Sequence, residues 1–248
     1  MSVDALAFRR RIGSLILSPN SIVEPDFNRM CPPGVTVHTA RAPLWDMDIS
    51  TDEALTKLLR SIGESLVEAA GTLFALRPDA LVLGISLESF AARTSASLGG
   101  KLAASLPPEI PLIEASSAVE AALKTLRIER LAVLTPYRPE ANELVRAFLS
   151  SIGVEVVALT SVDCPQATSI AEVPEEELRR QLCKLAEAKP QAIFQSGTNL
   201  SVLRLADEAE RWLGLPVLSV NAVLWWHAMR SVGVRDQMHG FGPLLREH

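Results

Sequence analysis

The sequence is poor in the residues and motifs that metal sites, disulfide frameworks and nucleotide-binding loops require. It holds four histidines and three cysteines, and neither an HExxH nor a CxxC pattern occurs. The cysteines are odd in number and widely spaced, at Cys31, Cys164 and Cys183, which argues against a disulfide framework or a zinc site. A GxGxxG loop and a Walker loop are also missing. These absences predict a cytoplasmic protein without a bound metal.

Positive charge and long apolar runs are equally scarce. The 248 residues carry 24 basic and 29 acidic side chains, a net charge of −5, without a lysine or arginine cluster. We therefore do not expect nucleic acid as a partner. No uninterrupted apolar stretch approaches the roughly eighteen residues of a membrane helix, so we expect no membrane span. The arginines near the N-terminus precede only a short apolar run without a small-residue cleavage site, which favours a first β-strand over a signal peptide.

Apolar segments rich in valine, isoleucine and leucine alternate along the chain with amphipathic segments. The composition, 48% hydrophobic, suits one large domain or two small ones. The predicted strands are Ile12–Leu17, Val35–Thr39, Ala80–Leu83, Leu112–Glu114, Leu131–Leu134, Glu155–Leu159, Ala192–Phe194 and Val217–Ser219. The predicted helices are Thr51–Ala75, capped by Ser50 or Thr51, then Ser116–Leu126, Glu140–Ile152, Glu175–Ala188 and Leu200–Leu213. This alternation predicts an α/β fold with parallel sheets flanked by helices.

Two segments of the chain resemble each other. RPDALVLGISLES at 77–89 aligns without gaps with KPQAIFQSGTNLS at 189–201, and the alignment places Ser86 on Thr198. Each segment has a basic residue, proline, an apolar strand and then a turn with a hydroxyl. The match is either a coincidence between two helix-to-strand joints or the mark of two similar lobes. In the second case, two strand ends would face a shared cleft, where ligands of open α/β sheets bind.

Two loops after predicted strands of the first half carry polar side chains. Ser18–Ser21 contains Asn20, which either forms a plain turn or presents an amide to a carboxylate. Gly84–Glu88 contains Ser86 and is either a tight turn or an anion site, because glycine permits close approach of the backbone. Glu88 in this loop is either a solvent-facing residue, which we favour, or a candidate base.

Two further loops follow strands of the second half. Thr135–Pro139 contains Tyr137, the only tyrosine of the chain, which either packs on the loop or donates to a substrate carboxylate. Ser196–Asn199 places three polar side chains around a glycine between a strand and a helix, which is typical of an anion-binding nest.

Other candidates are weaker. Cys164 is either an inert loop cysteine, which we favour, or a reactive thiolate. Trp225 and Trp226 favour a core or interface position, and an exposed patch at these tryptophans would be a candidate contact in a homo-oligomer. His227 beside them is expected to be structural, and no GxSxG elbow supports a Ser-His-Asp triad.

Taken in order along the chain, several segments resemble the aspartate/glutamate racemase superfamily, and within it the branch of maleate cis–trans isomerases and arylmalonate decarboxylases. The segments are RIGSLILSPNSIVEPDF, LTPYRPEANE, QSGTNL, ERWLGLPVLSVNAVLWWHAMRSVG and GFGPLLREH. The resemblance implies two pseudo-symmetric α/β lobes with a cleft between them. It also implies chemistry without a cofactor at a carbon beside a carboxylate of a small acid. We expect one lobe to comprise residues 1–115 and 220–248 and the other residues 116–219.

The chain departs from the family at its cysteines. Racemases and maleate isomerases of the family carry one in each lobe, and arylmalonate decarboxylase keeps the second. Here the alignment of the two segments places these positions at Ile85 and Gly197, or at Gly84 and Ser196 after a slip of one residue. None of the four can act as a cysteine does, since even serine is a poor unassisted acid or base. The two-cysteine mechanism and cysteine-dependent decarboxylation are therefore disfavoured.

Three hypotheses follow. The first is an enzyme on a small mono- or dicarboxylate, a decarboxylase or isomerase without a cysteine, in which donors stabilise the developing enediolate. Its expected catalytic residues are Ser86, Tyr137 and Thr198, and its expected substrate-binding residues are Asn20, Ile85, Ser196, Gly197 and Asn199. The second is a racemase or lyase whose acid or base has moved to Cys164 or Glu88. The third is a non-catalytic protein that binds a small acid. Independently of these hypotheses, the chain resembles family members without these cysteines that occur in ectoine-utilisation gene sets.

Overall fold

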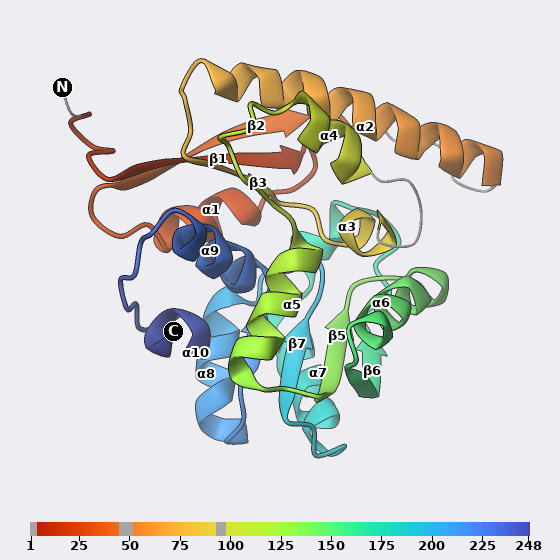
Figure 1. Ribbon diagram of the computed structural model, residues 1–248. Coiled ribbons are helices and arrows are strands. Elements are labelled where there is room, and N and C mark those ends of the chain that lie inside the picture. Colours follow the sequence, from red (N-terminus) through yellow and green to blue (C-terminus); the bar gives the residue numbers. More distant parts are fainter. Residues whose placement is uncertain (1–3, 45–51, 93–97) are drawn as a thin grey trace.

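Two parallel β-sheets of four strands each form the frame of the protein. The computed structural model describes residues 4–44, 52–92 and 98–248. The strand order is β2-β1-β3-β4 in the first sheet and β6-β5-β7-β8 in the second (Figure 1). The strands are β1 (Arg10–Leu17), β2 (Val35–Ala42), β3 (Ala80–Leu83), β4 (Leu112–Ile113), β5 (Arg130–Thr135), β6 (Glu155–Ser161), β7 (Ala192–Gln195) and β8 (Val217–Ser219). The predicted α/β fold with two lobes of parallel sheet is confirmed.

Helices cover both faces of each sheet. They are α1 (Val23–Arg29), α2 (Asp52–Phe74), α3 (Leu87–Ala92), α4 (Leu98–Ser105), α5 (Ala115–Leu126), α6 (Pro139–Ser151), α7 (Glu175–Ala186), α8 (Leu203–Leu213), α9 (Val220–Ser231) and α10 (Pro243–Glu247). A 3₁₀ helix spans Ser169–Glu172. The long helix α2 packs on β1 and β2, and α7 packs on β5, β6 and β7. Helices α5 and α9 pack against each other, and α9 contacts strands of both sheets, β3, β4 and β8 (Figure 1).

The largest hydrophobic core joins the two lobes. It contains side chains from the first sheet, such as Val82, and from the second, such as Val133, together with α5 and α9. Two smaller cores lie under α2 in the first lobe and under α7 and α8 in the second. Because apolar burial is the main driving force of folding, the shared core holds the lobes in a fixed relation, and therefore also the loops at their junction.

The internal repeat predicted from the sequence is present in the backbone. Arg77 and Lys189, which the alignment equates, both adopt a left-handed φ of 49°. Gly84 N donates to Leu15 O at 2.8 Å, and the aligned Ser196 N donates to Leu134 O at 2.9 Å. With corresponding strand orders as well, the alignment of the two segments describes the structure and equates Gly84 with Ser196. Ile85 and Gly197 are then equivalent positions of the two lobes.

Element boundaries differ from the predicted ones in a few places. Strands β3 and β8 have the predicted bounds, β4 is one residue shorter, and the remaining strands extend one to three residues further. Helix α8 begins at Leu203 rather than Leu200, because Leu200 N donates to Gly197 O and closes a turn before the helix. The predicted cap of the first long helix, Ser50 or Thr51, lies outside the described residues.

The core or interface position favoured for the two tryptophans is confirmed as a core position. Trp225 and Trp226 on α9 are buried, with exposed fractions of 0% and 5%. Trp225 packs on Phe27 of α1 at a ring-centroid distance of 5.1 Å, and its indole N–H donates to Met30 O at 2.6 Å. These side chains stabilise the shared core, so they offer no surface to a second copy of the chain.

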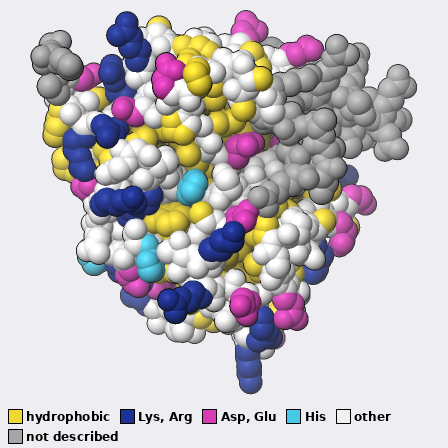
Figure 2. All heavy atoms as spheres, viewed as in Figure 1, with side chains coloured by type: hydrophobic (Ala, Val, Ile, Leu, Met, Phe, Trp, Pro, Cys, Tyr) yellow, Lys and Arg dark blue, Asp and Glu magenta, His cyan; other side chains and the backbone are white. Residues whose placement is uncertain are grey.

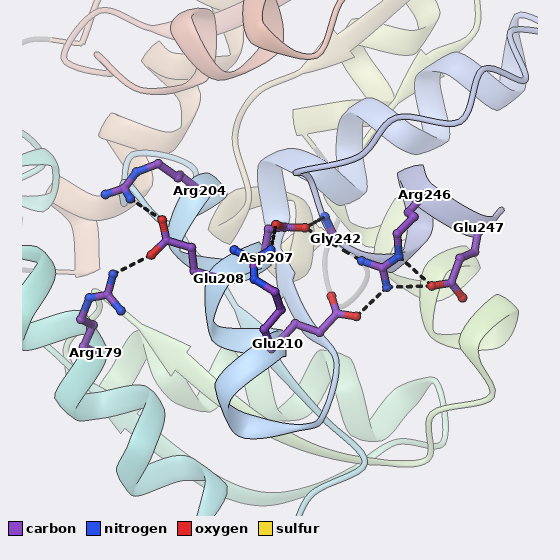
Figure 3. A network of polar contacts seen from close by, with 9 residues as sticks. Arg179, Arg204, Asp207, Glu208, Glu210, Gly242, Arg246 and Glu247 are labelled. Carbon is purple, nitrogen blue, oxygen red and sulfur yellow. Dashed lines mark hydrogen bonds and ion pairs between the residues drawn. The ribbon is translucent and has the colours of Figure 1, made fainter.

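Charged side chains of both signs share the surface. On the face in Figure 2, lysine and arginine are interspersed with aspartate and glutamate. On α8, Glu208 pairs with Arg179 of α7 at 2.7 Å, and Glu210 pairs with Arg246 of α10 at 2.6 Å (Figure 3). Such exposed pairs contribute little singly, but this row fixes α7 and the C-terminal helix on α8. Among the described residues, we find no helix whose length and apolar character would allow it to span a bilayer.

Candidate active site between the lobes

A cavity of about 140 Å³ lies where the carboxyl ends of strands from both lobes meet. Its first-lobe wall follows β1, β2 and β3, and its second-lobe wall follows β5, β6 and β7. The lining residues are Leu17, Pro19, Asn20, Leu44, Gly84, Ile85, Ser86, Leu87, Glu88, Tyr137, Ala167, Ile170, Gly197, Thr198 and Asn199. Seven of the eight residues predicted for the site therefore line one cavity. The eighth, Ser196, is fully buried behind it and does not reach its surface.

The hydroxyls of Ser86 and Tyr137 meet across the junction of the lobes. Ser86 Oγ lies 2.9 Å from Tyr137 Oη, and either atom can be the donor. The Tyr137 loop is held from behind, because Ser161 Oγ donates to its carbonyl and Asn142 Nδ2 donates to the same carbonyl at 3.3 Å. The two hydroxyl groups carry one proton each, and the hydrogen bond between them uses one of these protons. The other remains available to a bound carboxylate.

Thr198 and the two asparagines form a clamp between the lobes. Thr198 Oγ1 donates to Gly84 O at 3.0 Å and accepts from Asn20 Nδ2 at 3.2 Å. Asn199 Oδ1 accepts from Ser21 N at 2.9 Å, while its Nδ2 donates to Ala167 O at 2.9 Å. The single Thr198 proton is therefore committed to a backbone carbonyl. This geometry suits Thr198 to positioning the loops better than to donating to a ligand.

Gly197 is the glycine that the turn requires. Its φ is +106°, in the region that L side chains rarely adopt. A Cβ built at this position would lie 2.6 Å from Pro136 Cγ and 3.5 Å from Tyr137 Oη. Any side chain at this position, a cysteine included, is thus incompatible with the conformation of the loop.

Two ionisable groups line the cavity, Tyr137 and Glu88. Burial raises the pKa of the Tyr137 phenol above its ordinary value, and the charge of Glu88 raises it further, whereas the Ser86 hydrogen bond lowers it. Tyr137 is accordingly a neutral donor at physiological pH. Burial also raises the pKa of the Glu88 carboxyl. Glu88 is half-buried at the cavity wall, so the solvent-facing position favoured from the sequence is wrong.

The cysteines lie elsewhere. None of Cys31, Cys164 and Cys183, all described, lines the cavity. Cys164 sits in the loop after β6, where its N–H donates to Pro136 O at 2.9 Å, and burial with the nearby Asp163 charge raises the pKa of its thiol. Burial raises the pKa of Cys31 to about 11. Neither is placed or activated as a thiolate in the cleft.

Sequence reasoning missed the apolar wall and the support behind the site. Leu17, Leu44 and Ile170 line the cavity, but apolar residues at strand ends carry no distinguishing signal in one sequence. It also missed Asp26 of α1 and Asn221 of α9, both buried. Asn221 Nδ2 donates to Asp26 Oδ2 at 2.8 Å and to Thr198 O at 3.0 Å. The clamp is therefore tied to the central core.

Asp26 predicts a pH-dependent stability. Burial raises its pKa from the ordinary 3.8 to about 6. The folded state holds this proton more tightly than the unfolded chain. The contribution of protonated Asp26 to the free energy of unfolding is therefore fully present below pH 3.8 and is lost as the pH rises through about 6. In Asp26→Asn, the unfolding free energy relative to wild type should therefore rise by up to roughly 3 kcal/mol from acid to alkaline pH. Urea unfolding of both proteins at pH 4 to 8 measures this, and a constant difference would contradict it.

Among the described residues, no group of three or more His, Cys, Asp or Glu side chains is arranged to hold a metal ion.

Comparison with known proteins places these features in a known group. The sequence model of the arylmalonate decarboxylase family matches residues 50–245. An arylmalonate decarboxylase from Bordetella bronchiseptica is 30% identical over 141 residues, 56% of this chain and 59% of that protein. A maleate isomerase from Nocardia farcinica is 28% identical over 126 residues, 50% of each. The aligned parts of the chain thus span little more than half the length of these relatives.

The fold is shared more widely than these alignments. A cysteine-to-serine variant of the Nocardia farcinica maleate cis–trans isomerase, with a covalently bound succinylcysteine intermediate, superposes with a TM-score of 0.81. The superposition covers 96% of this chain and 99% of that one at 22% identity. At this identity the likeness concerns the two-lobe fold.

Proposed function

The chain belongs to the arylmalonate decarboxylase family, and we propose that it is an enzyme acting on the carbon beside a carboxylate of a small acid. The reaction we propose first is decarboxylation without an organic cofactor or a cysteine, and isomerisation is the second candidate. The curated relatives are a decarboxylase and isomerases, which supports this kind of activity. The substrate class is a small mono- or dicarboxylic acid, and the proposed location is the cytoplasm.

The observation that carries the proposal is the hydroxyl pair Ser86–Tyr137 in a mainly apolar cavity between the lobes. A carboxylate that accepts from this pair becomes a better electron acceptor when the neighbouring C–C bond breaks. The donors then stabilise the enediolate, and one such donor is typically worth about 3 kcal/mol in the transition state. The departing carboxylate would lie against the apolar wall of Leu17, Leu44 and Ile85, where losing its charge as CO₂ is favoured.

The cysteines favour decarboxylation over thiol-dependent isomerisation. The Nocardia isomerase forms a covalent bond to a cysteine, according to the variant with a succinylcysteine intermediate. The cavity of this chain offers no cysteine among its described lining residues. Decarboxylation depends on a base least among these reactions, because the leaving group itself supplies the electron pair.

Proton NMR of the purified protein in D₂O with a panel of small acids tests the function. The panel contains phenylmalonate, methylmalonate, maleate, aspartate, glutamate, hydantoins and ectoine-derived amino acids. We expect phenylmalonate or a related malonate to lose its α-proton signal and yield a product deuterated at that carbon. Conversion of maleate instead would support isomerisation. Line broadening without turnover of any member would contradict an enzyme and support the small-acid-binding protein.

A further inference from the structure

We infer that Glu88 is the proton donor of this cleft, in place of the cysteines of the family; the inference rests on the proposed decarboxylation. Among the fifteen residues that line the cavity, Glu88 and Tyr137 alone carry ionisable side chains. The hydrogen bond between Tyr137 and Ser86 assigns the phenol to the carboxylate-binding pair. Among the described lining residues, Glu88 is then the remaining group able to give a proton to carbon.

The position of Glu88 is fixed by both lobes. It lies in the first turn of α3, two residues after Ser86 of the loop that joins β3 to this helix. Helix α3 packs on α6 of the second lobe, where Phe90 stacks on Phe148 with ring centroids 4.6 Å apart. Glu88 and Tyr137 line the same cavity of about 140 Å³. A ligand held by Ser86 and Tyr137 therefore has Glu88 beside it.

A bound carboxylate would make Glu88 an acid rather than a base. Within the described part of the chain, Glu88 forms no ion pair with a basic side chain, and no lysine or arginine lines the cavity. Two carboxylates in one small, poorly solvated cavity cannot both stay ionised without a large penalty. Burial already favours the neutral form of Glu88. Binding of the substrate anion shifts it further in that direction.

In the proposed step, one C–C bond breaks and one C–H bond forms. With phenylmalonate, the bond between the α-carbon and one carboxylate breaks, CO₂ leaves, and the electron pair passes into the enediolate held by Ser86 and Tyr137. The neutral Glu88 carboxyl then gives its proton to the α-carbon, forming phenylacetate, and becomes a carboxylate. Water returns the proton to Glu88 before the next turnover.

Glu88→Gln keeps the shape of the side chain and removes the proton. We expect the kcat for phenylmalonate to fall about 100-fold, the range of general acid catalysis, with phenylacetate still bound. The matched control is Glu114→Gln, because Glu114 is also partly buried with a pKa raised by burial but lies outside the cavity. Its kcat should equal that of the wild type. A Glu88→Gln enzyme as fast as the wild type would overturn the inference and leave the proposed function intact.

Binding of phenylacetate, which does not turn over, gives a second readout. Titration calorimetry at pH 5 to 9, in two buffers of different ionisation enthalpy, reports the protons taken up with the ligand. We expect wild type and Glu114→Gln to bind more weakly as the pH rises and to take up a proton. Glu88→Gln should show neither effect. The same pH dependence in Glu88→Gln would overturn the inference. If wild type turns over no acid of the panel, the function fails and the inference fails with it.

Discussion

Removing both hydroxyls of the cleft, in Ser86→Ala with Tyr137→Phe, is expected to lower kcat/KM for the accepted acid about a thousandfold or more. Each donor to a developing enediolate is typically worth a factor of about a hundred or more, and the two share one carboxylate. The two hydroxyls bond to each other at 2.9 Å, so removing both takes away the two partners of that bond together. The fold should therefore persist, as circular dichroism and thermal unfolding would show.

A hydroxyl outside the cleft provides the control for this experiment. Ser151 Oγ donates to Phe148 O near the end of α6 and does not line the cavity. Ser151→Ala should keep the wild-type kcat/KM. Single variants at Ser86 and Tyr137 should each lose part of the activity, with a non-additive total because the groups act as a pair. Full activity in the double variant would remove both residues from the site.

Gly197→Ala is expected to have the largest effect on stability. The backbone there has a φ of +106°, and the new Cβ would meet Pro136 at 2.6 Å. Strain of this kind and overpacking each cost of the order of 1–3 kcal/mol, so the unfolding free energy should fall by roughly 2–5 kcal/mol. Any relaxation moves Pro136 and hence Tyr137, so turnover should fall as well. Urea unfolding and kcat measure the two effects.

A substitution at Gly153 distinguishes the effect of backbone strain from that of a steric clash. It also has a positive φ, +81°, but a Cβ there would meet no atom within 4 Å. Gly153→Ala should therefore cost about 1 kcal/mol, from backbone strain alone, and leave kcat unchanged. Equal losses of stability in the two variants would show that the contact with Pro136 is unimportant, against the account of this turn.

The frame of the fold follows directly from the sequence. Continuous apolar runs such as Ala80–Leu83 are buried on both faces, and the repeated basic–proline–strand–turn pattern marks equivalent places in the lobes. Polar residues just after such strands therefore gather at one cleft. The local sequence pattern is sufficient to predict these features because the carboxyl ends of parallel strands lie at the same edge of a sheet.

Features that depend on packing between distant segments were not predictable. Tryptophan side chains such as Trp225 and Trp226 suit both an interface and a core. Their position in the core depends on how α1 packs against α9. Glu88 follows a pocket loop, but its orientation depends on α3 docking against the second lobe. The hydrogen bond from Thr198 Oγ1 to Gly84 O joins residues 114 positions apart in the sequence, and no local sequence pattern predicts it.

A variant with Cys31→Ala, Cys164→Ala and Cys183→Ala together shows whether the reaction proceeds without a cysteine. Its initial rate with the acid that wild type converts would be measured by proton NMR in D₂O, beside wild type and the Ser86→Ala, Tyr137→Phe double variant. We predict a rate within about threefold of wild type, because no cysteine lines the cavity. A rate as low as that of the double variant, with the protein still folded, would contradict the account.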